Sequence, residues 1–123
     1  MTTVASDNAE LIRSYLAQLS GKPKTEEMIN QFVSDERLIE HIRRTESVAP
    51  NYELIPDQLV SEGNTVALRG KVRGTHLGDF NGIPPTGKRF SVDVAVFYRI
   101  DNGKIVDHWM VVDNLAAIQQ LKG

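Results

Sequence analysis

The chain has 123 residues, of which 41% are hydrophobic and 24% charged, and its formal net charge at pH 7 is −2. This length suits one domain with a single hydrophobic core, so we expect one domain over residues 1–123. The 14 basic and 16 acidic residues are mixed along the chain, which argues against a surface for nucleic acid or an anionic membrane. The absence of cysteine excludes disulfides and thiolate chemistry.

The N-terminal segment does not have the basic region and apolar run of a secretory signal. No stretch approaches the length that spans a membrane. We therefore expect a cytoplasmic protein.

The first third of the chain has helical periodicity. Asp7 and Glu10 have capping-box spacing ahead of an apolar stripe, which predicts a first helix that stops at Gly21. Thr25 can cap a second helix because two glutamates follow it and favour the positive end of the helix dipole.

A third helix and a closing helix have alternative caps. Ser34 or Asp35 can cap the third helix, which should end near Val48. Asp113 or Asn114 can cap a short helix at the end of the chain.

In the rest of the chain, apolar residues recur at every second position instead of with the 3.6-residue spacing of a helix. Four strands are predicted, over Tyr52–Val60, Thr65–Thr75, Arg89–Ile100 and Lys104–Asp113. Pro56 makes the first of them irregular or an edge strand. The Gly- and Pro-rich residues 78–87 form a loop that we interpret as a lid or rim. Helices segregated from antiparallel strands predict an α+β fold.

The register of the last two strands, joined at Asn102-Gly103, decides which side chains share a face. A two-residue loop would pair Asp101 with Lys104 and would put Asp113 on the apolar side of the preceding strand. A three-residue loop with Gly103 in a bulge shifts the register by one. We favour the second register because it separates polar from apolar residues. Its mixed face then holds Asp93, Phe97, Arg99, Asp107, Trp109 and Asp113.

The opposite face of these strands is almost wholly apolar and must be covered. We expect the helices to cover the mixed face and enclose a lined cavity. The apolar face would then be free to form a homodimer.

Asp113 is the first candidate for chemistry. It ends an apolar strand, and apolar surroundings raise the pKa of a carboxyl group and make it a useful general base. Asp is also a common helix cap. Without the family resemblance, the position of Asp113 before the last helix favours the role of a cap over that of a base.

Asp93 and Arg99 are charged residues within a predicted strand. Asp93 either faces a wet cavity or pairs with Arg99 or Arg69, and the ion pair is the favoured interpretation. Arg99 can stabilise an oxyanion, or its stem can cover the edge of the sheet.

Aromatic and histidine side chains supply candidate walls for a pocket. Trp109 and Phe97 lie on the mixed face, and Tyr15 and Tyr52 could reach the same space, although a core role is as consistent for each. His41 borders the apolar face of its helix, where a lone histidine is more often a hydrogen-bonded core residue than a ligand. The three histidines have no metal-ligand spacing, so no metal is expected.

Two segments carry a family resemblance. Residues Gly74–Lys88 resemble the signature loop of SnoaL-like polyketide cyclases, also called ester cyclases, of the nuclear-transport-factor-like superfamily. The end of the chain is similar too, with Asn102–Trp109, then Asp113, then Gln119–Leu121. The resemblance spans most of the chain and is strongest from residue 63 to residue 121.

The resemblance implies N-terminal helices over a cone-shaped curved antiparallel sheet, usually in a dimer. It also implies a cofactor-free pocket for a small apolar or aromatic molecule. Family cyclases close a ring by intramolecular aldol condensation of a polyketide methyl ester, and an aspartate at the position of Asp113 removes the α-proton. One departure is Arg99, which stands where the cyclases have a histidine and cannot exchange a proton. A non-catalytic binding module and a dimerisation module of the same fold are the alternatives.

Overall fold

The computed structural model describes residues 4–122, with side chains from residue 7 onward. Three helices precede four strands, and one helix follows them. The elements are α1 (Val4–Leu19), α2 (Glu26–Phe32), α3 (Glu36–Val48), β1 (Glu53–Glu62), β2 (Thr65–Thr75), β3 (Arg89–Asp101), β4 (Lys104–Val112) and α4 (Asn114–Lys122). The predicted α+β class and the order of the elements are confirmed.

Capping residues begin the helices as their chemistry requires. Thr25 Oγ1 accepts a hydrogen bond from the Met28 N–H at 3.1 Å at the start of α2. Asp35, one of the two predicted caps, accepts from the backbone N–H groups of Arg37 and Leu38 at the start of α3. The prediction for α1 is wrong at its start, since the helix begins at Val4 and Asp7 lies in its first turn.

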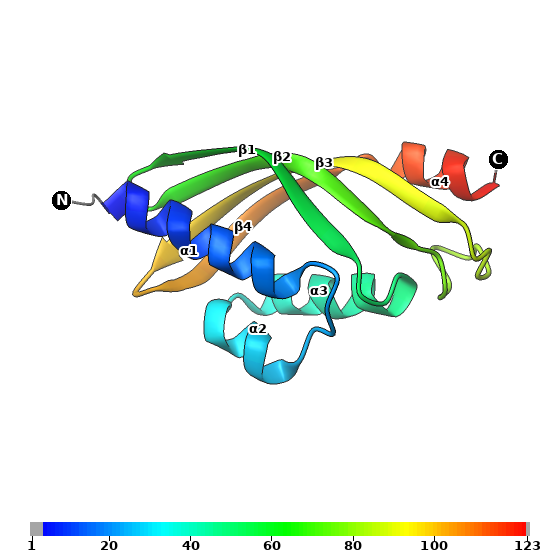
Figure 1. Cartoon of the computed structure of the whole chain (residues 1–123), viewed down its shortest axis with the longest axis horizontal. Coiled ribbons are helices and arrows are strands. Elements are labelled where there is room, and N and C mark those ends of the chain that lie inside the picture. Colours follow the sequence, from blue (N-terminus) through cyan, green and yellow to red (C-terminus); the bar gives the residue numbers. More distant parts are fainter. Residues whose placement is uncertain (1–3, 123) are drawn as a thin grey trace.

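The four strands form one antiparallel sheet in the order β1-β2-β3-β4. The sheet is curved, and α1, α2 and α3 lie together beneath it, while α4 lies at the other end of the strands (Figure 1). β1 is an edge strand whose register shifts between Pro56 and Gln58, as the proline predicted.

The β3–β4 hairpin has a two-residue turn. Asn102 and Gly103 both have positive φ (50° and 74°), which is the backbone of a type I′ turn, and Asp101 pairs with Lys104. The favoured three-residue loop is therefore wrong.

A bulge three residues beyond the turn restores the predicted grouping of faces. Ile100 pairs with Ile105, but Arg99 pairs with Asp107, so Val106 is an extra residue on β4. Beyond the bulge the cross-strand pairs are displaced by two residues from the favoured register, so Phe97 pairs with Trp109 and not with Asp107. A shift of two residues leaves the same side chains on each face. The mixed face therefore holds the predicted side chains, but a two-residue turn followed by a bulge produces it, and not a three-residue loop.

The helices cover the apolar face, and not the mixed one as expected. The apolar residues of β3 are at most 4% exposed and lie in the core with the helices, and they are Val92, Val94, Val96, Tyr98 and Ile100. The expected homodimer through the apolar face is therefore wrong, because the chain covers that face itself. The helices pack on the apolar face because this buries the most apolar surface. The apolar stripes of α1 and α3 and the apolar side chains of the strands are then removed from water together.

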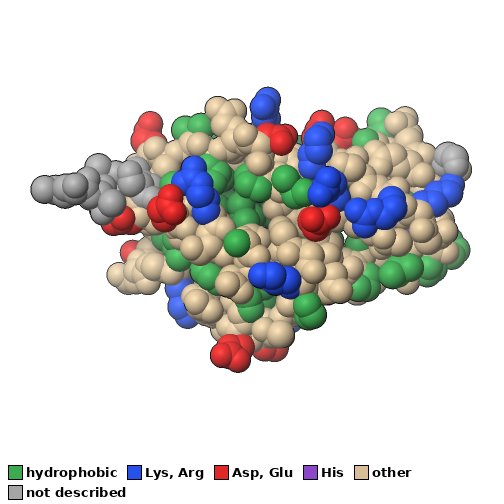
Figure 2. Space-filling model, in the orientation of Figure 1, with side chains coloured by type: hydrophobic (Ala, Val, Ile, Leu, Met, Phe, Trp, Pro, Cys, Tyr) green, Lys and Arg blue, Asp and Glu red, His purple; other side chains and the backbone are tan. Residues whose placement is uncertain are grey.

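The surface carries acidic and basic side chains close to one another, as Figure 2 shows for one face. Within residues 4–122, no helix combines the length and the apolar composition needed to cross a membrane.

Candidate functional site

An inner pocket of about 340 Å³ lies on the helix-covered side of the sheet. Its walls come from the second half of α3, the β2–β3 loop, the start of β3 and α4. Most of them are apolar, and they include Val48, Val72, Phe80, Phe90, Val92 and Val112. A mainly apolar cavity with a few polar groups is typical of a small-molecule site.

His41 and Asn114 are among the polar groups of the inner pocket. His41 is half-buried on α3, with Nε2 3.4 Å from Thr45 Oγ1. Burial lowers the pKa of His41, and the neighbouring His108 and Arg44 lower this pKa further. The imidazole is therefore held in its neutral form near pH 7, in which it can accept a proton.

The β2–β3 loop is fixed to the end of α3, which places the Phe80 ring at the pocket. The backbone N–H groups of Leu77 and Gly78 both donate to Val48 O, at 2.9 and 3.0 Å. A Cβ atom at Gly78 would lie 1.9 Å from Ser47 O, so only glycine permits this approach. The loop therefore forms part of the pocket rim, as predicted.

A second anchor of the loop is His76, which is fully buried. His76 Nδ1 accepts a hydrogen bond from the Thr86 N–H at 3.2 Å and lies 3.0 Å from Thr86 Oγ1. The two ends of the loop are thereby held together beneath its tip.

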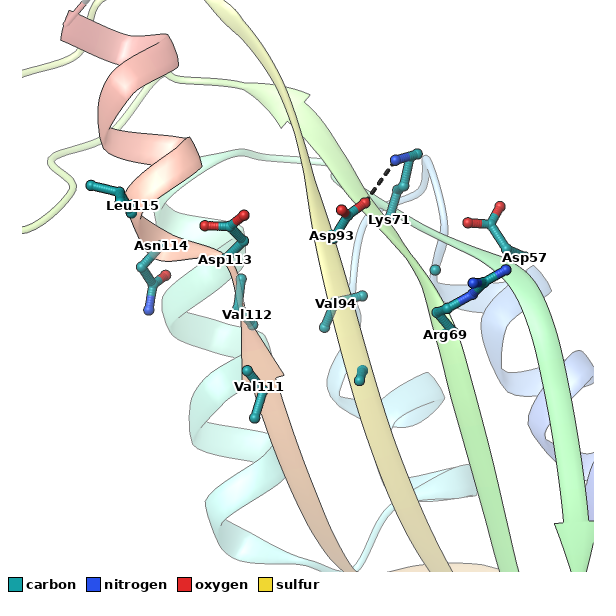
Figure 3. Close-up of a pocket in the computed structure, with 12 residues that line it drawn as sticks. Asp57, Arg69, Lys71, Asp93, Val94, Val111, Val112, Asp113, Asn114 and Leu115 are labelled. Atoms are coloured by element: carbon teal, nitrogen blue, oxygen red, sulfur yellow. Dashed lines mark hydrogen bonds and ion pairs between the residues drawn. The ribbon is translucent and has the colours of Figure 1, made fainter.

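Asp113 lies outside the inner pocket. Its Oδ1 accepts a hydrogen bond from the Ala116 N–H at 3.0 Å, so the carboxylate caps α4, and the side chain is exposed. Both chain neighbours, Val112 and Asn114, line the inner pocket. Figure 3 shows the Asp113 and Asn114 side chains pointing away from each other.

The Asp113 side chain lines a wider outer hollow of about 810 Å³ on the uncovered face of the sheet. Asp57, Arg69, Lys71 and Asp93 also line this hollow, and all are exposed (Figure 3). The outer hollow is the larger of the two, but water surrounds its charged groups. The inner pocket is the better candidate because apolar side chains supply more of its walls.

The strand charges Asp93 and Arg99 each have a partner on the neighbouring strand. Asp93 Oδ1 lies 2.7 Å from Lys71 Nζ, so the ion pair is present but with a different cation from the two considered. Lys71 holds the pKa of Asp93 below its usual value. Arg99 lies 3.8 Å from Asp107. The two pairs occupy separate parts of the exposed face.

The candidate aromatic residues divide between the two faces. Phe97 and Trp109 make an edge-to-face contact (centroids 5.7 Å apart, 87°) and are 49% and 59% exposed on the outer face. Tyr15 is buried against Phe32 and Tyr98. Tyr52 is 4% exposed, and Lys24 Nζ lies 4.3 Å from its ring centroid. These two tyrosines belong to the packed core, and His41 is the one predicted site residue that lines the inner pocket.

Residues 4–121 match the family of SnoaL-like polyketide cyclases. The chain belongs to this family.

Individual relatives support the assignment. The aklanonic acid methyl ester cyclase DnrD of Streptomyces peucetius is 37% identical over 67 residues, which are 53% of this chain and 46% of the relative. The match thus spans less than half the length of that curated relative.

Solved structures have the same fold. TsrD from Streptomyces laurentii superposes with a TM-score of 0.76 at 28% identity, covering 92% of each chain. A SnoaL-like polyketide cyclase from Agrobacterium tumefaciens superposes with a TM-score of 0.77 at 23% identity, covering 98% of this chain and 99% of the other.

Several pocket residues of this SnoaL-like chain escaped prediction from the sequence. Thr45, Phe90 and Asn114 line the inner pocket, but none has a motif of its own. The available signal was positional, since Thr45 lies one helical turn after His41 and therefore on the same side of α3.

Proposed function

We propose that this SnoaL-like chain binds a small apolar or aromatic molecule in the inner pocket and acts on it by cofactor-free acid–base chemistry. The observation that carries the proposal is the apolar cavity of about 340 Å³ with a neutral imidazole at its wall. Apolar walls favour an apolar molecule, and His41 and Asn114 offer hydrogen bonds that could orient it.

The proposed reaction is ring closure by intramolecular aldol addition. A base removes a proton from the carbon beside a carbonyl, and the enolate carbon bonds to a second carbonyl carbon of the same molecule. The alkoxide then takes up a proton, so the product is an isomer of the substrate. No oxidant or reductant is needed. The name of the curated relative supports this class, since that protein is a cyclase of a methyl ester.

His41 is the proposed base, because it lines the pocket and a lowered pKa keeps it unprotonated near neutral pH. Asp113 is the second candidate, supported by the family resemblance and by its position between two residues of the pocket wall. Against Asp113 stand its exposure and its bond to the helix that it caps.

The test uses aklanonic acid methyl ester, the compound in the name of the relative. Binding is followed by NMR shifts of the pocket valines and conversion by chromatography. We expect His41→Gln to abolish conversion while binding persists. Ala117→Leu, which fills the pocket, should weaken binding, and Leu115→Ala on the exposed side of the same helix should not.

Three results would change the proposal. Conversion that survives in His41→Gln but is lost in Asp113→Asn would make Asp113 the base. Binding without conversion in the wild type would favour the non-catalytic binding module. Shifts that avoid the pocket valines would refute the site itself.

A further inference from the structure

Helix α3 carries three arginines, and two of them are bound to carboxylates of the protein. The guanidinium of Arg37 lies 2.7 Å from the carboxylate of Asp107 on β4. Arg43 makes three hydrogen bonds to the carboxylate of Glu26 on α2, at 2.6, 2.7 and 3.1 Å. The donors of these two guanidinium groups are therefore already engaged.

The third arginine, Arg44, has donors to spare. Its guanidinium lies 3.8 Å from Glu40 Oε1, which is beyond hydrogen-bond distance. Within residues 7–122, where side chains are described, this guanidinium makes no hydrogen bond. The side chain is 69% exposed, so its solvation is supplied by water. A ligand anion can replace that water without breaking a contact within the protein.

Arg44 is also the arginine of α3 that lines the inner pocket. It follows His41 by three positions, and residues three apart lie on the same side of a helix. After burial and His108, Arg44 is the third cause that lowers the pKa of His41. Its positive charge therefore reaches the imidazole at the pocket wall.

Among the described residues that line the inner pocket, Asp79 is the other charged one. Its Oδ2 accepts a hydrogen bond from the Gly82 N–H at 3.1 Å, so this carboxylate is engaged within its own exposed loop. Asn81, between them, lines the pocket and carries an amide N–H₂ that can donate. Amide and guanidinium donors both suit an anionic oxygen.

These groups select a ligand with an apolar body and one acidic end. A guanidinium presents two parallel N–H donors that match the two oxygens of a carboxylate. A neutral ligand leaves the same guanidinium in water and gains nothing from it. The apolar body would contact the aliphatic and aromatic walls of the pocket, which include Val48, Val72, Phe80 and Phe90.

We propose that Arg44 binds a carboxylate of the ligand, so that the inner pocket prefers an aromatic or other apolar carboxylic acid to the methyl ester of the same acid. The inference rests on the proposed function in one respect, since both assign the ligand to the inner pocket. It adds the charge of the ligand, and it does not depend on which residue is the base. The ester stays a weaker ligand because it offers the same apolar surface.

The test compares naphthoate with its methyl ester, two probes with the same rings and different charge. Calorimetric titration near neutral pH measures affinity, and NMR shifts of the pocket valines locate the ligand. We expect the wild type to bind the acid about 10-fold more tightly than the ester. Arg44→Gln should weaken binding of the acid by about 10-fold and leave binding of the ester unchanged.

Arg43→Gln is the matched control, because Arg43 is the adjacent residue and its guanidinium is bound to Glu26. This variant should leave both affinities unchanged. Added salt should reduce the preference of the wild type for the acid, because ions screen a charge pair near the surface. Thermal melts verify that each variant is folded.

The outcomes separate the inference from the proposed function. Equal affinities of the wild type for acid and ester, or a preference that Arg44→Gln retains, would overturn the role of Arg44 and leave the apolar pocket standing. The same holds if Arg43→Gln removes the preference as well. Shifts that avoid the pocket valines would refute both proposals. A preference for the acid that depends on Arg44, without any conversion of a polyketide ester, would support the inference and count against the proposed reaction.

Discussion

The imidazole of His108 donates from Nδ1 to Asp35 Oδ2 at 2.7 Å, with the two side chains only 12% and 5% exposed. The other carboxylate oxygen of Asp35 caps α3. The Asp35 N–H also donates to Ile105 O. One carboxylate thus fastens the start of α3 to β4, and α3 is a wall of the inner pocket.

Removal of this carboxylate should be costly. We expect Asp35→Ala to lower the free energy of unfolding by about 3 kcal/mol, because it removes a helix cap and leaves a buried imidazole without its partner. Asp35→Asn retains a good cap and should cost about 1 kcal/mol. Urea denaturation measures both. Equal losses in the two variants would contradict the double role of Asp35.

Protonation of His41 at acid pH should destabilise the folded protein. The pKa of His41 is lowered in the folded state, so the unfolded chain binds the proton more tightly. Its contribution to stability is therefore present above the unfolded pKa of about 6.5 and is lost as the pH falls through the folded pKa. Melting temperatures at about pH 7.5 and about pH 5.5 should differ less in His41→Gln than in the wild type. An identical difference would show that other groups carry the acid sensitivity.

The sequence predicted the elements well and their assembly less well. Thr25, Pro56 and the period-two strands act through local chemistry, so their effects could be read without the fold. The face that the helices cover depends on which surfaces meet in three dimensions, and the pattern of β3 fits either packing. The bulge at Val106 leaves the same side chains on each face as a three-residue loop would, so periodicity does not distinguish the two.

The candidate site was harder to predict, for the same reason. Trp109 of β4 and Asp113, which directly follows β4, lie on the same side of the sheet, and their chemistry suggested a lined cavity. The structure puts that face toward solvent. His41 was named as a pocket residue although its position favoured a core role, and the pocket forms there because α4 and the β2–β3 loop meet α3.

The β2–β3 loop should depend on the glycine at its base. Gly78→Ala would bring a Cβ atom to within 1.9 Å of Ser47 O, a backbone atom that cannot move without shifting α3. We expect a loss of about 2–4 kcal/mol in the free energy of unfolding and altered shifts in the inner pocket. Leu77→Ala, at an exposed neighbouring position, is the control and should be nearly neutral. A neutral Gly78→Ala would show that the loop does not rest on α3.

Tyr98 should tolerate the loss of its hydroxyl. The side chain is buried, and its oxygen has no hydrogen-bond partner among the residues that the structure describes. Burial without a partner is unfavourable for a hydroxyl, so Tyr98→Phe should leave the free energy of unfolding unchanged or raise it by up to about 1 kcal/mol. Urea denaturation decides the sign. A loss greater than about 1 kcal/mol would mean that the hydroxyl has a partner, such as a buried water.

Substitutions of Asp113 can distinguish a structural role of its carboxylate from a catalytic one. Asparagine caps helices about as well as aspartate, so Asp113→Asn should leave the melting temperature nearly unchanged. Asp113→Ala removes the cap of α4 and should cost about 1 kcal/mol. If Asp113 only caps the helix, the conversion of a polyketide methyl ester should follow stability and survive in Asp113→Asn. If it is the base, conversion should fall by at least about 100-fold in Asp113→Asn while the melting temperature holds.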